Sequence, residues 1–544
     1  MTDTYHIYGP PGCGKTTTLA RQANLAIEKH GADRVVFSSL TKASANEMRS
    51  RGLPLMDDRI GTLHSLCFHQ LGIKHNEVAD TPKKLKEWNE SVNPSLQVNP
   101  KMGTTFEDIF SGGDTEEREG DKAFKEMQIN RARMLPEKKW KKSTLYFFKE
   151  WAAWKKANGY TDFTGMIERA LEETDYAPGD PKILFGDECQ DYSKLEITLL
   201  RDHWGKRAEK VLLAGDPDQA IFEWRGADPK VFIDHPIPEE NKRFLKQSYR
   251  LPKIPHAKAL KWIRQIKNRE DVEFKPREGN GSVSFLSTGY KEPEEIVRVI
   301  EREISEDRTV MVIGSCRYML TPLIKQLKAK YIPFWNPYST DPIWNPLKTK
   351  KNEIWGIDRV LSFLRPDPDT YGSEARDWNS KEMRTWMAIL HSGGLLERGV
   401  KSLIADEDWG CPPTIKDFEN LFLKPEFAHN AINTDLNWFK QNVTKLGLNQ
   451  IKFPGGVALR HGGKRLMERP KVVVGTIHSV KGGEADTVIV FPDLAWVEQR
   501  TIEESRSEEE KMIRKFYVAI TRTKDKLFIC EPQDSRQLVY ADLL

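Results

Sequence analysis

The apolar and polar positions of the chain predict two stretches in which short buried strands alternate with amphipathic helices. Apolar runs of strand length occur at residues 5–8, 34–40, 182–187 and 210–215, and again at residues 282–286, 309–313, 471–475, 487–491 and 526–530. Helical periodicity occurs at residues 15–30, 294–304, 321–330 and 354–364. Strands that alternate with helices in this way favour an α/β fold with parallel sheets.

Two regions interrupt this alternation, and we expect them to be inserted domains. Residues 72–165 are rich in Lys, Glu and Trp, with aromatic residues at helical spacing over residues 146–154. They predict a helical unit whose tryptophans form its own core; the alternative is a basic face that contacts phosphates. Residues 366–465 are less periodic and contain many turn residues. Two halves remain: residues 1–71 with 166–248, and residues 249–365 with 466–544.

The composition is typical of a soluble globular protein with several domains and argues against several classes of site. Of 544 residues, 38% are hydrophobic and 30% charged, and no apolar run has membrane-spanning length. The amino terminus lacks a signal-peptide pattern, so we expect a cytoplasmic protein without a membrane partner. A net charge of +4 implies that any nucleic-acid surface is a local groove. Six cysteines without a Cys-x-x-Cys pair argue against zinc, iron–sulfur and disulfide frameworks.

The sequence GPPGCGKT at residues 9–16 fits the phosphate-binding pattern G-x-x-x-x-G-K-[ST]. A predicted strand precedes it and a predicted helix follows it, which is the order that this loop requires. Side chains at Gly12 or Gly14 would block the approach of phosphate to the backbone N–H groups. Lys15 is suited to the β- and γ-phosphates and the Thr16 hydroxyl to Mg²⁺. The alternative is a glycine-rich turn that fits by chance.

Acidic and polar residues follow two of the other predicted strands in the first half. The strand at residues 182–187 ends in Asp187 and Glu188, which are suited to hold Mg²⁺ and to polarise an attacking water. The strand at residues 210–215 leads to Gln219, a candidate sensor of the γ-phosphate. Surface acids at strand ends are common, but the nearby phosphate loop favours the catalytic interpretation.

Seven sequence blocks occur in the order found in the UvrD/Rep-type helicases of superfamily 1, which this chain resembles. They are GPPGCGKT; residues 41–48, similar to the family's TNKAAxEM; GTLHS; DECQD; GDPDQAIFEWRGA; QSYR; and TIHSVKGGEAD followed by FYVAITR. The resemblance implies two RecA-like P-loop motor domains with parallel sheets that clamp ATP between them. It also implies that each motor domain carries a mainly helical insertion. Here the insertions would be residues 72–165 and residues 366–465, of which the second is reduced in size. Such short insertions suggest a compact, phage-type member.

The resemblance implies the roles of the nucleotide-site residues. Glu188, Gln219, Arg250 and Arg522 would be catalytic, with the two arginines acting as fingers from the second domain. Tyr249 would stack on the base and Glu484 would approach the sugar–phosphate side. Thr16 and Asp187 would hold Mg²⁺, and the phosphate side of ATP would contact Gly9, Pro10, Gly12, Cys13, Gly14, Lys15, Thr16 and Thr17.

The family also implies a DNA track and a motor activity. The activity would be ATP-dependent 3′→5′ movement on single-stranded DNA with unwinding at duplex junctions. Two alternatives remain: a motor that acts on RNA, and a DNA-sensing nucleotide hydrolase that switches a partner without unwinding. The residues that would line the strand are Thr41, Thr62, His64, Trp224, Arg225, His478 and Lys481.

Several positions depart from the family pattern. Only eight residues precede Gly9, whereas the family's adenine-reading glutamine lies further upstream, so we expect looser selection for ATP. Leu40 occupies a position where the family usually has Phe, which removes one stacking surface. Thr17 stands where an adenine-stacking Arg is common. The residues after Arg522 are too few for a nuclease domain or a long partner-binding tail.

Overall fold

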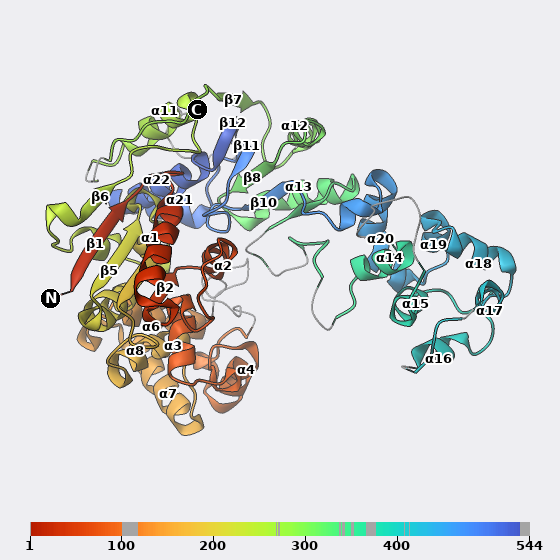
Figure 1. Cartoon of the computed structure of the whole chain (residues 1–544), viewed down its shortest axis with the longest axis horizontal. Coiled ribbons are helices and arrows are strands. Elements are labelled where there is room, and N and C mark those ends of the chain that lie inside the picture. Colours follow the sequence, from red (N-terminus) through yellow and green to blue (C-terminus); the bar gives the residue numbers. More distant parts are fainter. Residues whose placement is uncertain are drawn as a thin grey trace.

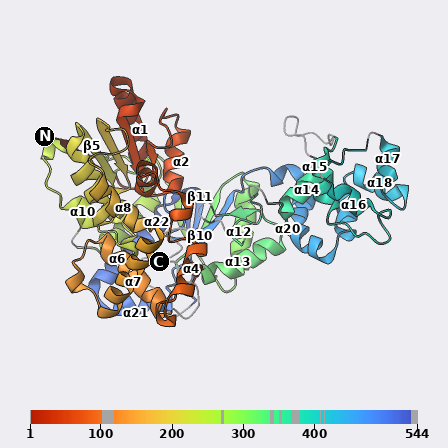
Figure 2. The same ribbon diagram turned by 90° about the horizontal axis from the view of Figure 1, so that it is seen from below.

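The chain folds into a body with two sheets and an arm of helices that extends from one side of it (Figures 1 and 2). The computed structural model describes residues 2–100, 118–267, 269, 272–336, 339, 343–349, 353–365, 377–406, 408–412 and 414–533. The predicted domain junction at residue 366 lies outside the described residues. Within those ranges, no helix is both long and apolar enough to cross a membrane.

The first sheet belongs to the amino-terminal half of the chain. Its strand order is β3 (Ile60–Gly61), β2 (Val35–Ser39), β4 (Ile183–Asp187), β5 (Lys210–Gly215), β1 (Asp3–Tyr8) and β6 (Lys242–Phe244), with neighbours parallel. Its helices are α1 (Lys15–His30), α2 (Lys42–Ser50), α3 (Leu63–Gln70), α8 (Phe163–Glu173), α9 (Lys194–Ile197) and α10 (Pro229–Ile233). Because the strands are parallel, the carboxyl ends of β1, β4 and β5 meet at one edge, where ligands bind in such sheets.

The second sheet is built in the same way from the carboxyl-terminal half. Its order is β7 (Ser282–Leu286), β12 (Thr523–Cys530), β11 (Ala485–Val490), β8 (Val310–Gly314), β10 (Val472–Thr476) and β9 (Phe334–Trp335), again parallel. Its helices are α11 (Lys253–Ile263), α12 (Glu294–Ser305), α13 (Arg317–Ala329), α21 (Trp496–Glu504) and α22 (Arg506–Ile520). The two parallel sheets with flanking helices confirm the predicted fold class.

The first helical insertion lies between β3 and β4 and has its own core. It contains α4 (Pro82–Ser91), α6 (Glu119–Ala132) and α7 (Lys142–Asn158). Trp88 and Trp151 are completely buried there, with ring centroids 5.1 Å apart. Phe124 and Phe147 belong to the same buried cluster. The expectation that tryptophans form the core of this unit is confirmed.

The arm contains α14 (Gly356–Leu364), α15 (Ser380–Met387), α16 (Val400–Ala405), α17 (Ile415–Glu419), α18 (Pro425–Ile432), α19 (Leu436–Gln441) and α20 (Lys445–His461). These helices lie together at one side of the body (Figure 1), and their buried side chains form a separate cluster. The sequence pattern predicts α14 as part of the second α/β half, but the helix packs against α15 and α20. Its Phe363 stacks on Phe439 of the arm at 4.3 Å, so its apolar face is buried by the arm and not by the sheet.

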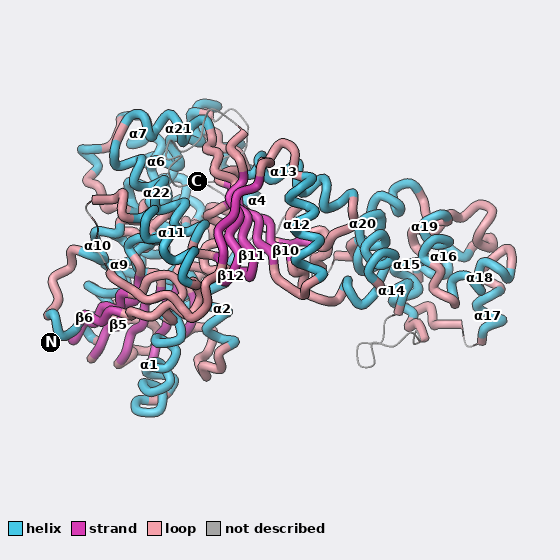
Figure 3. The backbone as a smooth tube through the Cα atoms, turned by 90° about the horizontal axis from the view of Figure 1, so that it is seen from above, coloured by secondary structure: helices cyan, strands magenta, loops and turns pink. Residues whose placement is uncertain are grey.

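The two α/β halves share one continuous apolar core. Helix α22 packs beside α11 in the second half (Figure 3) and also contacts the turn that follows β5 in the first half. The apolar face of α22 is buried, as are residues of both sheets in the same cluster: Leu184, Leu213, Met311, Val488, Ile513, Phe516, Tyr517 and Ile520. Apolar burial therefore holds the halves together at the edge where their loops meet.

One helix begins earlier than the sequence pattern predicts. The periodicity predicts a helix from residue 66, whereas α3 starts at Leu63. The Thr62 hydroxyl accepts a hydrogen bond from the backbone N–H of Ser65 at 3.2 Å and caps this end. Threonine at this position supplies the acceptor that the first helical turn lacks, so the helix extends back to it.

A buried carboxylate joins the first helical insertion to the first sheet. Asp162 caps α8 and its side chain has no exposed surface. It accepts hydrogen bonds from both terminal nitrogens of Arg131 at 2.6 and 3.0 Å and from the Trp151 indole at 2.6 Å. Lys155 lies 2.8 Å away. Burial alone would raise the pKa of Asp162, but Arg131 and Lys155 hold it well below the usual range. The junction therefore depends on an ionised carboxylate.

Asp162→Asn is expected to loosen this junction because it removes the negative charge and leaves Arg131 and Lys155 buried without it. Breaking a buried pair costs about 3–5 kcal/mol of stability. Because local opening then becomes easier, amide hydrogens in α6 to α8 are expected to exchange at least about 100-fold faster. Hydrogen exchange with mass spectrometry measures this locally. Glu173→Gln is the control, since its bridge to Arg169 is largely exposed and contributes at most about 1 kcal/mol. Equal exchange in the two variants would contradict the prediction.

Candidate active site and nucleic-acid interface

The glycine-rich loop at residues 9–16 connects β1 to α1. Gly12 and Gly14 both have a left-handed backbone, with φ of +72° and +76°. A β-carbon at Gly12 would lie 2.4 Å from the β-carbon of Arg250, so this position also requires the absence of a side chain. The Lys15 ammonium donates to the Gly9 carbonyl at 2.7 Å and is buried in the loop.

Pro10, Cys13 and Thr17 are also predicted to contact the phosphates of ATP. Pro10 and Cys13 are buried, and burial raises the pKa of the Cys13 thiol to about 12. Thr17 is exposed at the start of α1, and its hydroxyl accepts a hydrogen bond from Arg51 at 3.1 Å. Cys13 is therefore a neutral packing residue, and Thr17 is turned toward α2.

The end of β4 brings a candidate metal site to this loop. The Thr16 hydroxyl donates to Asp187 Oδ2 at 3.0 Å. Hydroxyl and carboxylate oxygens are ligands that Mg²⁺ prefers, and Mg²⁺ in nucleotide sites is usually held by one or two protein groups and the phosphates. Burial, and then the charge of Glu188, raise the pKa of Asp187. A cation beside Asp187 would compensate this buried charge, so the residues present fit a magnesium ion.

Glu188 follows directly and adopts a strained backbone. Its φ of +56° and ψ of +39° are left-handed, which is uncommon for residues other than glycine and carries a conformational cost. Its carboxylate accepts from the Gln190 amide at 2.6 Å. Burial alone would raise the pKa of Glu188, but the charges of Lys15 and Lys481 lower it. Glu188 is thus an ionised carboxylate beside the loop, as a general base must be.

The first half contacts an arginine of the second half through Gln219. The Gln219 amide donates to Asp216 Oδ2 at 2.5 Å, and its oxygen accepts from Arg522 Nη2 at 2.6 Å. Arg522 is 1% exposed and also donates to the carbonyls of Val518 and Gly483. This hydrogen bond directly joins a predicted catalytic residue of each half.

The remaining predicted nucleotide residues lie on the other side of the loop. Arg250 Nε donates to Glu484 Oε2 at 2.9 Å. The Tyr249 backbone N–H donates to the Gly12 carbonyl at 2.9 Å, while its side chain is 74% exposed. An exposed aromatic ring held beside a phosphate loop is available for stacking.

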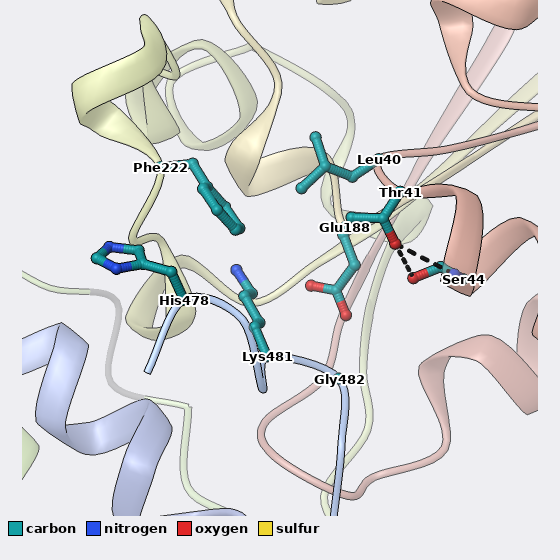
Figure 4. Close-up of a pocket in the computed structure, with 8 residues that line it drawn as sticks. All are labelled: Leu40, Thr41, Ser44, Glu188, Phe222, His478, Lys481 and Gly482. Carbon is teal, nitrogen blue, oxygen red and sulfur yellow. Dashed lines mark hydrogen bonds between the residues drawn. The ribbon is translucent and has the colours of Figure 1, made fainter. Parts of the chain in front are cut away.

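A pocket between the halves lies next to Glu188 (Figure 4). Leu40, Thr41, Ser44, Glu188 and Phe222 line it from the first half, and His478, Lys481 and Gly482 line it from the second. The Lys481 ammonium contacts Asp191 and donates to the Gln219 carbonyl at 2.5 Å. Lys481 is therefore largely buried in an interdomain ion pair, although the sequence analysis predicts it to contact the strand.

Aromatic rings extend this pocket. Trp224 meets His478 edge-on with ring centroids 5.7 Å apart, and Phe222 lies 5.8 Å from His478. Burial lowers the pKa of His478, so its ring is neutral. Phe222 is only 3% exposed, so the partly buried rings of Trp224 and His478 are the ones that can stack with bases.

Two other predicted DNA contacts, His64 and Arg225, line a second pocket. Arg225 is buried, with Nη2 3.4 Å from Glu196 Oε1. His64 Nδ1 lies 4.0 Å from the same carboxylate oxygen, and burial lowers the pKa of His64. Thr62 caps the helix that carries His64. Thr41, His478 and Lys481 thus line the first pocket, and His64 and Arg225 line the second, where Arg225 faces a protein carboxylate.

Two contributors were not singled out from the sequence. Phe222 lies within GDPDQAIFEWRGA but was not assigned a role, and Asp191 ends DECQD. Their positions within these blocks were the available signal. Their partners, His478 and Lys481, lie more than 250 residues away in the chain, so the contacts themselves had no local signal.

Two family models match the chain in sequence order. The UvrD/REP helicase N-terminal domain matches residues 1–236, and the UvrD-like helicase C-terminal domain matches residues 424–533. Together they cover more than half of the chain. The first match contains the glycine loop, Asp187, Glu188 and Gln219, and the second contains His478, Lys481 and Arg522.

Individual bacterial proteins named as DNA helicases have sequences similar to this chain. The ATP-dependent DNA helicase PcrA of Staphylococcus aureus is 26% identical over 324 residues, which are 55% of this chain and 43% of PcrA. The probable DNA helicase II homolog of Mycoplasma genitalium is 19% identical over 589 residues, covering 96% of this chain and 82% of that protein. The alignment with PcrA therefore spans less than half of that protein's length. The family models, matched to the two halves that meet at Gln219 and Arg522, show that this chain belongs to the UvrD-like helicases of superfamily 1.

Proposed function

We propose that this protein is an ATP-dependent DNA helicase that moves 3′→5′ along single-stranded DNA and separates strands at duplex junctions. The observation that carries the proposal is the Gln219–Arg522 contact, which joins the two halves beside the glycine loop. Family membership supports ATP as the nucleotide and DNA as the polymer. The direction rests on the resemblance of the motif blocks.

The residues of the site divide the work of hydrolysis between the halves. Bound ATP with Mg²⁺ supplies the phosphoanhydride, and the metal neutralises charge on the phosphates. Thr16 and Asp187 would hold the metal, and Lys15 would bind phosphate oxygens. Glu188 would accept a proton from the attacking water. Arg250 and Arg522 would add positive charge from the second half, so the full set of charges is present only when the halves are together.

The pocket beside Glu188 connects the residues of the hydrolysis site with the residues proposed to bind DNA. Lys481 contacts Asp191 and the Gln219 carbonyl, and it belongs to the same loop as His478. A change at Gln219 is thereby passed to the aromatic group of Phe222, Trp224 and His478. We propose that the rings of Trp224 and His478, packed against buried Phe222, grip bases of a single strand, and that alternating grip advances the motor.

The deciding experiment measures ATP hydrolysis and strand displacement on duplexes with a 3′ or a 5′ single-stranded tail. We expect hydrolysis stimulated by single-stranded DNA and displacement from the 3′ tail. DNA-stimulated hydrolysis without displacement or translocation would favour the switch alternative. Stronger stimulation by RNA than by DNA would favour an RNA motor. Absence of hydrolysis with Mg²⁺ and DNA would contradict the proposal.

Glu188→Gln is expected to lower turnover by at least about 100-fold, the usual contribution of a general base, while nucleotide binding is retained. The amide cannot accept the proton, but the loop that holds the phosphates is unchanged. Steady-state hydrolysis and a fluorescent-nucleotide titration measure the two effects. Glu172→Gln, at an exposed position of α8, is the control. Near-normal turnover of Glu188→Gln would reject this residue as the base.

Gly12→Ala is expected to weaken nucleotide binding at least about tenfold, because the new methyl group meets Arg250 and a left-handed alanine costs about 1–2 kcal/mol. Gly52→Ala is the matched control: φ is +78° there, but nothing lies within 4 Å of the new carbon. The control carries the same backbone strain without the clash. If both variants lose affinity equally in a nucleotide titration, the contact with Arg250 is not the cause.

Trp224→Ala is expected to weaken single-strand binding by about 1–3 kcal/mol, or roughly 5- to 150-fold, with little change in melting temperature. The ring is half-buried and meets His478, so it could instead be a packing residue. Trp88→Ala provides the scale for that alternative, since emptying a buried tryptophan site costs about 3–5 kcal/mol of stability. A melting-temperature loss like that of Trp88→Ala, with affinity intact, would assign Trp224 to the core.

A further inference from the structure

The turn that carries Gln219 is held from the second half at three points. The turn is a short 3-10 helix over Pro217–Gln219, and Asp216 caps it by accepting from the Asp218 backbone N–H at 3.2 Å. Arg522 contacts the Gln219 side chain, and Lys481 contacts the Gln219 carbonyl. The third contact is made by Arg269, which belongs to none of the seven sequence blocks.

Arg269 forms a two-pronged ion pair with Asp218. Its Nη2 lies 2.8 Å from Asp218 Oδ2, and its Nε lies 3.2 and 3.1 Å from the two carboxylate oxygens. The side chains are only 7% and 10% exposed. Arg269 follows α11, whose neighbour α22 contacts the same turn. The pair therefore joins the two halves within a largely buried layer.

A pair in this environment orients the groups that form it. Burying two charges costs several kcal/mol, and only a well-aligned arrangement compensates that cost, so the planar guanidinium fixes the carboxylate in one orientation. Asp218 is one peptide bond from Gln219, and the turn is too short to change at one residue alone. Fixing Asp218 therefore limits where the Gln219 amide can point.

We propose that Arg269 is a positioning residue that sets the orientation of the 216–219 turn, and through it the contact of Gln219 with the γ-phosphate. The role at the phosphate rests on the proposed function, whereas the effect on the turn does not. Arg269 acts on the turn through Asp218. Its contribution is to the turnover step, not to nucleotide or strand affinity.

The test separates positioning from stability by removing one charge or both. Arg269→Met leaves the Asp218 carboxylate without the Arg269 guanidinium, and Asp218→Asn leaves the guanidinium without the carboxylate. Each variant is therefore expected to lower stability. The double variant Asp218→Asn/Arg269→Met removes both charges and is expected to recover most of the melting temperature. Turnover of the double variant is expected to stay about tenfold or more below wild type, with KM for ATP within about twofold, because a misplaced group slows the chemical step.

Hydrogen exchange of residues 216–224 provides a readout that does not depend on hydrolysis. We expect faster exchange there in the double variant and not in Arg308→Met, which breaks a pair with buried Glu303 elsewhere in the second half. Unchanged exchange in the turn, or recovery of wild-type turnover by the double variant, would overturn the proposal. If wild-type protein does not hydrolyse ATP but the turn loosens as expected, the proposed function fails and the role of Arg269 in orienting the turn stands.

Discussion

The organisation of the molecule depends on the division of one set of charges between two halves. The first half supplies Lys15, Asp187 and Glu188 at the carboxyl ends of its strands, and the second supplies Arg250 and Arg522. These groups are largely buried, and buried charge is costly unless opposite charge or hydrogen bonds lie close by. The contacts Gln219–Arg522 and Asp191–Lys481 meet that requirement across the interface. Each of these two contacts takes one partner from each half, whereas Arg250 pairs with Glu484 of its own half.

The two inserted units are attached in different ways, and this difference follows from their contacts. The first helical insertion is joined to the sheet by Asp162, whose carboxylate binds groups from α6 and α7 while it caps α8. Such a junction transmits displacement as a rigid connection. The arm instead has its own buried cluster, centred on residues such as Trp386 and Phe439, and extends away from the body (Figure 2). The first insertion is thus tied to the first sheet by buried charge, whereas the arm is held together by its own apolar cluster.

Local features of the fold could be predicted from the sequence, and nonlocal ones could not. The strands at Lys210–Gly215 and Ser282–Leu286 and the helix at Lys15–His30 have the predicted bounds, because apolar runs and a terminating glycine determine them locally. The start of α3 was missed because a threonine cap overrides periodicity over one turn. The placement of α14 was missed because its apolar face suits either a sheet or a helical neighbour, and only tertiary packing distinguishes them.

The same distinction explains why the two candidate sites were predictable to different degrees. The glycine loop and the acids after β4 depend on backbone conformations within a few residues, so a contiguous motif contains most of the information needed to place them. The pocket between the halves beside Glu188 depends on side chains from distant segments. The motif blocks do not specify which of their residues face one another. Lys481 pairs with Asp191 of the other half, and Arg225 pairs with Glu196 of its own half, because each buried charge requires a counter-charge close by. Arg269 illustrates the limit of motif-based prediction: it lies outside the seven blocks, and only the folded chain brings it to Asp218 beside the sensor turn.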